Sequence, residues 1–420
     1  MTAVLLFVIA AILSSALTVV QTFLVWGFLR RPRRRLAEAP PRLESPKPPL
    51  APRASTPQVS ILKPLCGLED ELEENLASFA CLDGVSYEVV LSVASSTDPA
   101  IEVAKRVMAR FPASPFVLIT GGVTPGLVAN PKVERLIAAS RVARGDIFFI
   151  SDSNIRVLPD DIAQTIKAFD DPSVGCVSNP FTAEGASSFG AAIESLYLLS
   201  FVLPGVIFAR AGGAVCVVGK SMAITRRVWD RIGGFEAFRD ILAEDQAIGL
   251  AVKADGRRWE LSTRVVRNVI VKRTLGQALD RQLRWGKIRF AFSKTLYTAE
   301  FLLNPFPLAL TACFLSLLLT PQWLAYTAAL AVGSACLRVT QVMAAGRATG
   351  AGLPFAHAVL APVQDLLQFA TQFIPFFSRE VNWREHRARL GRGCVMLRTR
   401  QQRQRESQPA EAGLKWGRQL

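Results

Sequence analysis

Residues Ala3 to Trp26 form an almost wholly apolar run, and a basic cluster from Arg30 to Arg35 follows it directly. A run of this length can cross a bilayer as one helix, since a crossing needs about 20 residues. A cleaved signal peptide is the alternative. Against it, no basic residue precedes the apolar run, and the arginines lie on its carboxyl side. We therefore predict an uncleaved transmembrane anchor over residues 1–29.

A second apolar region begins after residue 300 and contains stretches at about 306–319, 322–345 and 353–377. The third stretch is interrupted by prolines and polar residues, which favours a segment that lies at the interface or re-enters the membrane. The interrupting residues are Pro354, Pro362, Gln364, Asp365, Gln368, Gln372 and Pro375. We predict two full crossings, at about 302–320 and 322–345. A charge inside a span is costly, so we expect Arg338 to snorkel toward the cytosolic end.

The chain is basic, with a formal net charge of +15. Its arginines and lysines gather at Arg30–Arg35 and Arg379–Arg405, next to apolar stretches, which predicts that both clusters lie in the cytosol against an anionic membrane surface. That placement needs an even number of crossings after residue 300. Because no aromatic residues are interleaved with the charges, we expect no nucleic-acid partner. The pattern predicts a multi-pass protein of the cell inner membrane with a cytoplasmic middle domain.

The cysteines exclude two kinds of stabilisation. Seven cysteines are scattered without a CxxC pair, and the chain has only two histidines. A structural zinc site and a disulfide framework are therefore not expected. Isolated cysteines in apolar surroundings act as small core residues, which fits a reducing compartment.

Between residues 58 and 178 the sequence alternates between strand and helix patterns. This alternation predicts an α/β fold with a mostly parallel sheet covered by helices on both faces. In such sheets, ligands bind beyond the carboxyl ends of the strands. The strands are expected at 58–63, 87–94, 115–120, 146–151 and 174–178, and the helices at 70–80, 99–111, 132–143 and 160–169.

Asp152 follows the buried strand predicted at 146–151, so it lies at an edge where a ligand is expected. Asp152, Ser153 and Asn154 can form an ordinary turn, because all three side chains bond readily to their own backbone. A carboxylate in this position can also hold a divalent metal that bridges two phosphates.

Two further acidic positions have alternative interpretations. Glu244 and Asp245 precede a predicted helix, where acids complement the helix dipole, but one of them can also act as a general base toward a hydroxyl group. Asp98 follows the strand predicted at 87–94 and can cap the next helix, whose first residue is Pro99.

The stretch "RQLRWGKIRF" carries a basic and aromatic helix face. On a helix, Arg281, Arg284 and Trp285 share one side, at spacings of three and four residues. Two guanidinium groups and an indole there can clamp a diphosphate and stack on a ring. A basic helix beside the membrane is the alternative, and Lys287 and Arg289 fit that role better.

These residues occur in the order Asp98, Asp152, Glu244-Asp245, Arg-x-x-Arg-Trp, which resembles the D, D, D, (Q/R)xxRW series of family 2 and 21 glycosyltransferases. The chain is most similar to the ceramide glucosyltransferase group, including the bacterial type that is related to hopanoid glycosyltransferases. The resemblance covers about residues 58–295. The resemblance rests on the stretches "VSILKPLCGLEDELEENLASF", "TDPAIEVAKRVMARFP", "ANPKVERL", "ISDSNIRVLPD", "GKSMAITRRVWDRIGGF", "AEDQAIG" and "RQLRWGKIRF".

The resemblance implies a GT-A type, Rossmann-like catalytic domain and a role for each matching residue. Asp98 would contact the uridine of a UDP-sugar, Asp152 would coordinate Mg²⁺ or Mn²⁺ on the diphosphate, and Asp245 would be the catalytic base. The remaining substrate-binding residues would be Pro64, Lys132, Arg281, Arg284 and Trp285.

The implied reaction is an inverting transfer of a hexose from a UDP-sugar to the hydroxyl of a membrane lipid. The first candidates are glucose for the hexose and ceramide for the lipid. Transfer to a hopanoid or another lipid is an alternative, as are a processive polysaccharide synthase and a catalytically inactive membrane scaffold. Two departures bear on the acceptor. The first motif, Ser95–Asp98, has one acid where relatives often have two or three, and Ser178 stands where the eukaryotic branch usually has histidine.

The expected organisation has five parts. They are an anchor at 1–29, a basic proline-rich linker at 30–57, the catalytic domain at 58–295, a membrane region at 296–378 and a basic cytosolic tail at 379–420. Within the catalytic domain, the apolar stretch 189–211 can be a core helix, or an interfacial helix that admits a lipid headgroup.

Overall fold

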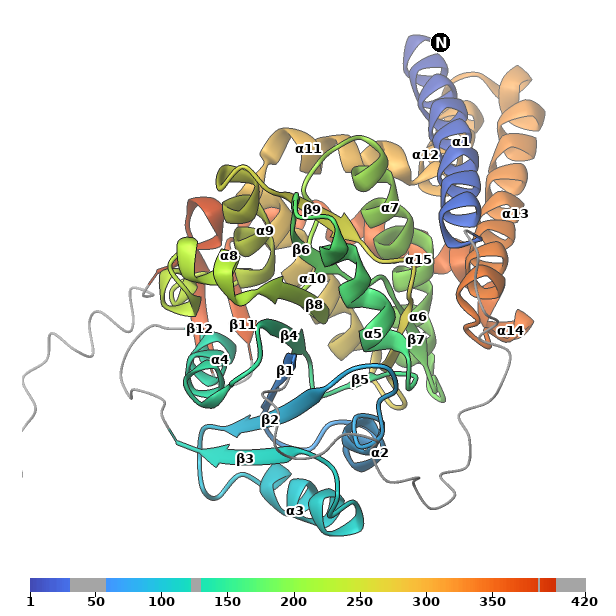
Figure 1. The fold of residues 1–420 in the computed structure, drawn as a ribbon. Helices are drawn as coiled ribbons and strands as arrows, with labels where there is room; N and C mark the ends of the chain where they lie inside the picture. Colours follow the sequence, from blue (N-terminus) through green and yellow to red (C-terminus); the bar gives the residue numbers. More distant parts are fainter. Residues whose placement is uncertain (31–57, 122–129, 384–385, 398–420) are drawn as a thin grey trace, which may run out of the picture.

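The computed structural model describes residues 1–30, 58–121, 130–383 and 386–397 of the chain. The predicted linker, apart from Arg30, and the end of the predicted tail lie outside the described residues. Figure 1 shows an α/β body with a bundle of long helices at one side.

A seven-stranded sheet forms the centre of the α/β body, in the order β3-β2-β1-β4-β8-β6-β9. All neighbouring strands run parallel except at β8, which is antiparallel to both β4 and β6. The mostly parallel sheet predicted from the sequence is therefore present. The strands are β1 (Val59–Leu65), β2 (Tyr87–Val93), β3 (Phe116–Thr120), β4 (Ile147–Ser151), β6 (Val174–Ser178), β8 (Ser221–Thr225) and β9 (Arg258–Leu261).

Helices cover both faces of this sheet, so its central strands are buried on both sides. In β4, Phe149 packs into one apolar core while its neighbours Phe148 and Ile150 pack into the core on the opposite face. This alternation follows from the two-residue period of a strand and explains why the strand reads as a continuous apolar run. The surrounding helices are α2 (Leu72–Ala77), α3 (Ala100–Arg110), α4 (Pro131–Val142), α5 (Asp161–Ile166), α8 (Arg226–Arg231) and α9 (Glu244–Ala254).

Two smaller sheets complete the body. The first, in the order β5-β10-β7, consists of Ile155–Arg156, Val266–Val269 and Phe181–Glu184. The second consists of β11 (Glu380–Trp383), β12 (His386–Leu390) and β13 (Met396–Leu397). Residues 380–397 were expected to belong to an extended basic tail, but they form this sheet because Val381, Ala388, Leu390 and Met396 bury apolar side chains beside Leu242.

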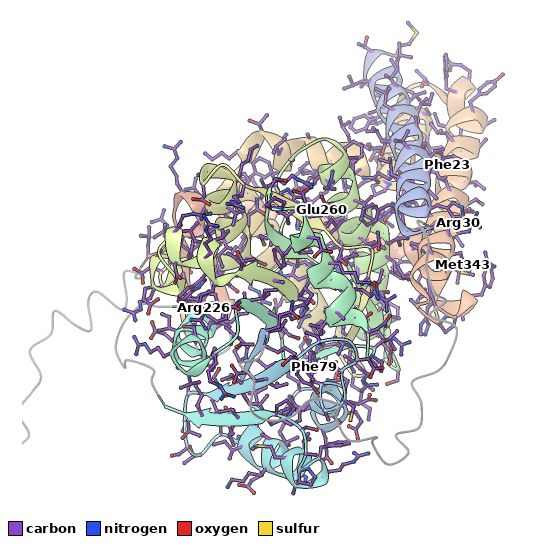
Figure 2. All side chains as sticks on the ribbon, viewed as in Figure 1. Phe23, Arg30, Phe79, Arg226, Glu260 and Met343 are labelled. Carbon is purple, nitrogen blue, oxygen red and sulfur yellow. The ribbon has the colours of Figure 1, made fainter. Side chains whose placement is uncertain are left out.

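The long apolar helices pack against one another at the side of the body (Figure 1). They are α1 (Thr2–Leu29), α12 (Pro305–Leu319) and α13 (Leu324–Thr349). The helices α1 and α13 are each long and apolar enough to cross a membrane, and α12 becomes so together with the segment Lys294–Leu303, from which it is bent by 70°. Phe23 of α1 is 72% exposed and points away from the body (Figure 2), as expected for a side chain that faces lipid.

The segment 189–211 also has the length and hydropathy of a span, but 83% of its most apolar 18-residue stretch is buried inside the protein. It forms α6 (Phe189–Tyr197), one π-helical stretch (Leu198–Val202) and α7 (Leu203–Ala211). This burial favours the core-helix interpretation over the interfacial one.

The segment 353–377 is broken into three short helices: α14 (Phe355–Ala358), α15 (Ala361–Thr371) and α16 (Ile374–Phe377). Their exposed side chains are apolar, and Phe377 is 89% exposed. The buried side chains of α15 include Gln364, Asp365 and Gln368. A helix with its polar face inward and its apolar face outward suits a lipid boundary, as predicted for an interfacial segment.

Arg338 corrects one expectation, because its side chain is 1% exposed and does not snorkel. Its guanidinium makes a bidentate ion pair with Asp365 of α15, with N–O distances of 2.6 and 2.7 Å. It also donates to the backbone carbonyl of Ser200 at 3.2 Å. The charge is tolerated because this ion pair and hydrogen bond replace its water, and together they tie α13 to α15 and to the π-helical stretch.

We expect Asp365→Ala to destabilise the protein by about 3–5 kcal/mol, because it leaves the buried Arg338 cation without its partner. The double variant Arg338→Met/Asp365→Leu, which removes both charges, should recover most of this loss. Thermal unfolding in detergent, with the exposed Arg347→Met as the matched control, measures the effect. An Asp365→Ala midpoint no lower than that of the control would contradict a stabilising role for the pair.

Candidate active site

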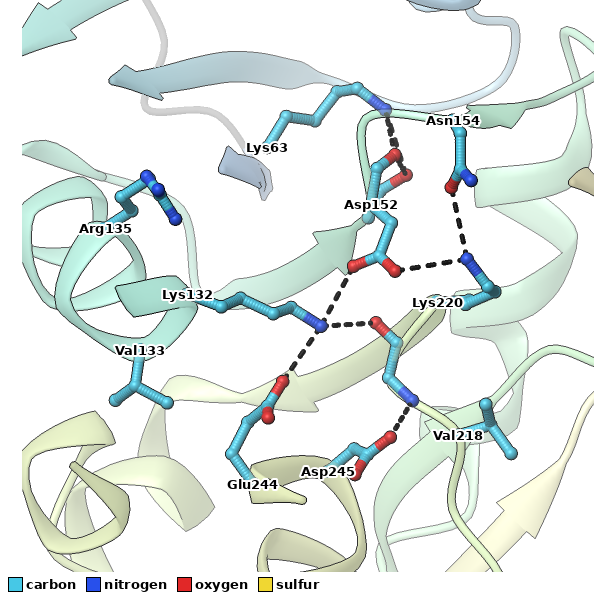
Figure 3. Close-up of polar contacts among 12 residues, drawn as sticks. Lys63, Lys132, Val133, Arg135, Asp152, Asn154, Val218, Lys220, Glu244 and Asp245 are labelled. Carbon is cyan, nitrogen blue, oxygen red and sulfur yellow. Dashed lines mark hydrogen bonds and ion pairs between the residues drawn. The ribbon is translucent and has the colours of Figure 1, made fainter. Parts of the chain in front are cut away.

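The predicted metal residue Asp152 directly follows β4, at the carboxyl end of the central sheet. Its position is fixed by the backbone, because its amide donates to the carbonyl of Lys220 at 3.1 Å, at the start of the antiparallel strand β8. Lys63 of β1 donates to the carbonyl of Asp152 at 2.9 Å and to Ser151 Oγ at 3.1 Å. These contacts leave the carboxylate to face the side chains in Figure 3.

Lys132 reaches the same place from the first turn of α4. Asn130 caps this helix by accepting from the amides of Lys132 and Val133 at 3.0 and 3.4 Å, and Pro131 occupies the first helical position. This is a favourable helix start. The side-chain amide of Asn130 also donates to Glu244 Oε2 at 3.2 Å, so the capping residue itself contacts the acidic pair.

The Lys132 ammonium joins three parts of the site (Figure 3). Its Nζ lies 2.9 Å from Asp152 Oδ1 and 2.8 Å from Glu244 Oε1. It also donates to the Gly219 carbonyl at 3.2 Å. These three acceptors come from the end of β4, the start of α9 and the loop before β8. An ammonium has three N–H donors, and here each has an acceptor.

The charges shift one another's pKa in opposite directions. Burial alone would raise the pKa of Asp152, but Lys132 and Lys220 outweigh it and hold that pKa well below its usual range. Burial alone would lower the pKa of Lys132, but Asp152 and Glu244 raise it above its usual value. Both groups therefore stay charged near neutral pH.

Asp245, the predicted base, lies in the first turn of α9 next to Glu244. Its carboxylate accepts from the Gly219 amide at 2.5 Å and from its own neighbour, the Gln246 amide, at 2.8 Å. Burial and the adjacent Glu244 raise the pKa of Asp245 to about 6. A Cβ atom on Gly219 would lie 2.7 Å from that of Asp245, so only glycine permits this close approach.

Asp98 and Pro64 lie at the neighbouring strand ends. The Asp98 carboxylate accepts from the Gly67 amide at 2.9 and 3.0 Å and from the Ala100 amide at 2.9 Å, so it connects the start of α3 to the loop after β1. Pro64 is buried in β1 and pairs in register with Ser92 of β2. The Asp98 contacts provide a structural role for this residue whether or not it also binds a nucleotide.

The predicted basic and aromatic residues lie on α10 (Leu275–Phe292), which begins with a capping box formed by Thr274 and Gln277. Arg281 pairs with the fully buried Glu194 of α6 at 2.8 Å. Trp285 packs against Phe181 and Tyr197, with ring centroids 6.4 and 6.0 Å apart. Burial and then the charge of Arg281 lower the pKa of Lys220, against the raising effect of Asp152.

Arg284 is on the same helix, within one turn of Arg281. The structure thus brings Lys132, Asp152 and Asp245 into one cluster and orients Arg281 and Trp285 on the adjacent helix.

The divalent metal implied by the resemblance can be tested against the donor set. No group of three or more histidine, cysteine, aspartate or glutamate side chains is close enough for a metal site within the described part of the chain. Mg²⁺ is often held by only one or two carboxylates together with substrate phosphates. Asp152, whose side chain is 25% exposed, and the amide oxygen of Asn154 fit that kind of site.

Three residues of the site were not predicted from the sequence. Lys220 contacts Asp152 at 3.4 Å, Glu194 forms an ion pair with Arg281, and Gly219 leaves room for the close approach of Asp245. Lys220 and Gly219 lie just before β8, a strand that was not expected. Glu194 is the only acid in the apolar stretch 189–211, and that isolation was the signal that could have identified it.

Comparison with known proteins decides the family. The sequence model of glycosyl transferase family 21 matches residues 6–396. The chain belongs to this family. It is 30% identical to ceramide glucosyltransferase 3 of Caenorhabditis elegans over 264 residues, which cover 62% of this chain and 57% of that protein. It is 23% identical to a ceramide glucosyltransferase of Pyricularia oryzae over 299 residues, which cover 58% of this chain and 60% of that protein.

The family 21 chain therefore spans less than two thirds of the length of these relatives. Among solved structures, it is similar to the mannosyltransferase PcManGT from Pyrobaculum calidifontis in complex with GDP-Man and Mn²⁺. That match has 20% identity and a TM-score of 0.45, and it covers 87% of this chain and 99% of that one. Family membership and the observed sheet confirm the predicted glycosyltransferase family and its GT-A type α/β fold.

Lys132→Met should lower the free energy of unfolding by about 3 kcal/mol at pH 7, because it removes the cation of the buried Glu244 and one of the two cations beside Asp152. The pKa of Asp152 is depressed in the folded state, so its stabilising effect is present above its unfolded value of about 3.9 and is lost as the pH falls through the folded value. The difference between wild type and variant should therefore narrow below about pH 4. Denaturant titrations at several pH values measure it, with the exposed Lys105→Met as control. A pH-independent difference would contradict the ion-pair account.

Proposed function

We propose that the chain transfers a hexose from a UDP-sugar to the hydroxyl of a membrane lipid, with inversion at the anomeric carbon. Glucose is the first candidate for the hexose, and ceramide is the first candidate for the lipid. The observation that carries the proposal is the Lys132 ammonium, which holds Asp152 and the Glu244-Asp245 pair in one buried cluster. Membership of family 21 and the similarity to proteins named ceramide glucosyltransferase support the reaction class.

In this reaction Asp245 removes the proton from the lipid hydroxyl. The resulting oxygen attacks the anomeric carbon as the bond between that carbon and the UDP oxygen breaks. A base works best when its pKa lies near the working pH, and burial beside Glu244 raises the pKa of Asp245 to about 6. The Gly219 and Gln246 amides hold one carboxylate oxygen each and so fix its orientation.

Charge develops on UDP as it leaves, and fixed cations are the usual means of stabilising it. Arg281 and Arg284 of α10 would contact the diphosphate, and the Lys132 ammonium, held by its three acceptors, would add its positive charge beside it. Trp285 would contact the acceptor end of the site, and Asp98 would contact the uridine. A divalent metal at Asp152 and Asn154 would supply further charge neutralisation when bound. Pro64 would shape the nucleotide site from β1.

The membrane arrangement supports a lipid acceptor. The exposed apolar side chains of α14–α16 face outward, and the polar face of α15 contacts α10, where Gln364 and Gln282 exchange hydrogen bonds of 3.0 and 3.2 Å. The helix that carries Arg281 and Trp285 therefore packs directly on the segment proposed to lie at the lipid boundary. A lipid hydroxyl would approach the site along this boundary.

The C-terminal sheet supports the proposed topology. The Leu242 amide donates to the Cys394 carbonyl at 3.0 Å, and the Met396 amide donates to the Asp240 carbonyl at 2.7 Å. The sheet β11–β13 thus lies on the same side of the membrane as the catalytic domain. This arrangement needs an even number of crossings between α10 and β11, for which α12 and α13 are the proposed spans. We place the catalytic domain in the cytoplasm, at the inner membrane.

The test reconstitutes the full chain in vesicles that contain ceramide, adds UDP-glucose as the donor, and measures the masses of the lipids that form. Wild type should form a lipid with the mass of ceramide plus one hexose. Asp245→Asn should lower turnover by at least about 100-fold, the scale of general base catalysis, while retaining UDP binding. Asp255→Asn, which removes a partly exposed carboxylate that pairs with Arg231 just after the end of α9, is the matched control.

Hexose attached only to a hopanoid in vesicles that contain both lipids would keep the reaction class and replace the acceptor. No hexosylated lipid with any UDP-hexose, despite UDP binding, would favour the inactive scaffold. Full activity of Asp245→Asn would remove Asp245 from the role of base.

A further inference from the structure

Lys220 is a second buried lysine on Asp152, and the roles given above do not use it. It immediately precedes β8, and its side chain is 9% exposed. Its Nζ lies 3.4 Å from Asp152 Oδ2 and 3.1 Å from Asn154 Oδ1. The two lysines therefore contact different oxygens of one carboxylate (Figure 3).

The two ammonium groups differ in how fully they are used. Lys132 has three acceptors, at 2.9, 2.8 and 3.2 Å. Among the described residues Lys220 has two, and its ion pair with Asp152 is longer by 0.5 Å, at 3.4 Å against 2.9 Å. An ammonium has three N–H donors, so Lys220 keeps one for another acceptor, whereas Lys132 is saturated. Lys132 is suited to hold the site together, and Lys220 is suited to contact a ligand.

The surroundings of Lys220 indicate the charge of that ligand. Lys220 contacts the predicted metal residue Asp152 and the neighbouring Asn154, while burial and then the positive charge of Arg281 on α10 lower its pKa. Its backbone is fixed by the hydrogen bond from the Asp152 amide, so only the side chain is free to turn. An anion placed between Asp152 and Arg281 would meet Lys220.

We propose that Lys220 binds the diphosphate of the nucleotide donor directly. The inference rests on the proposed function, because it takes the donor to be a nucleoside diphosphate sugar. In the free protein Lys220 neutralises Asp152. When the diphosphate enters, the ammonium turns to a phosphate oxygen and releases Asp152 Oδ2. Lys220 is thus a donor-binding residue, and the exchange couples occupation of the diphosphate site to the freeing of the Asp152 carboxylate.

The test measures UDP binding by calorimetry on the full chain in detergent, with a chelator present so that no metal contributes. Lys220→Gln keeps most of the side-chain length and removes the charge, and it should weaken UDP binding about tenfold or more, as expected for a lost charge-assisted hydrogen bond. Lys220→Arg should bind UDP within about threefold of wild type. Lys105→Gln, an exposed lysine on α3, is the matched control and should leave binding unchanged.

Added salt provides an independent readout, because it screens charged contacts. The affinity of wild type for UDP should fall more steeply with salt than that of Lys220→Gln. Unchanged UDP affinity in Lys220→Gln would overturn the proposal, as would equal weakening in Lys220→Gln and Lys220→Arg, which would indicate a structural role only. If wild type binds UDP only with Mn²⁺ in place of the chelator, the same variants are compared with Mn²⁺ present. Failure of wild type and Lys105→Gln to bind UDP under either condition would instead overturn the proposed function.

Discussion

The Lys132 ammonium is the interaction on which the rest of the site depends. Asp152 lies after β4, Glu244 begins α9, and Gly219 precedes β8, and this one cation holds all three within hydrogen-bonding distance. Without it, the buried Glu244 would lose its cation and would face the Asp152 carboxylate across the site. The antiparallel strand β8 is what makes the arrangement possible, because it begins at the carboxyl end of β4, which places the preceding Gly219 beside Asp245.

A second buried ion pair performs a similar task in the membrane region. Arg338 of α13 binds Asp365 of α15 and the Ser200 carbonyl in the π-helical stretch. The segment that contains Ser200 also carries Glu194, which holds Arg281. Contacts therefore run without interruption from a membrane helix to the predicted diphosphate clamp. In the proposed reaction, this continuity would connect the helices at the lipid boundary to the residues that hold the donor.

The sequence predicted the β-α alternation up to β6 because each of those strands is a short apolar run, and β1, β2, β4 and β6 are buried along their whole length. It did not predict β8, where small and apolar residues follow Lys220 without a turn signal. For the same reason it missed Lys220 and Gly219, whose importance depends on a tertiary contact with Asp152 and Asp245. Arg338 was expected to reach water, but its partner Asp365 lies 27 positions away in the sequence, and such a pairing has no local signature. All the functional roles assigned to site residues remain predictions: those of Pro64, Asp98, Lys132, Asp152, Asp245, Arg281, Arg284 and Trp285.

The central claim is that Asp245 acts as a single base in one direct displacement at the anomeric carbon. The stereochemistry of the product tests this most directly, because one displacement inverts the configuration and two displacements retain it. The measurement is a proton NMR spectrum of the glycolipid made from UDP-glucose, whose glucose is α-linked. A single direct displacement should give a β-linked sugar, which is identified by the large coupling constant of its anomeric proton. An α-linked product would contradict it.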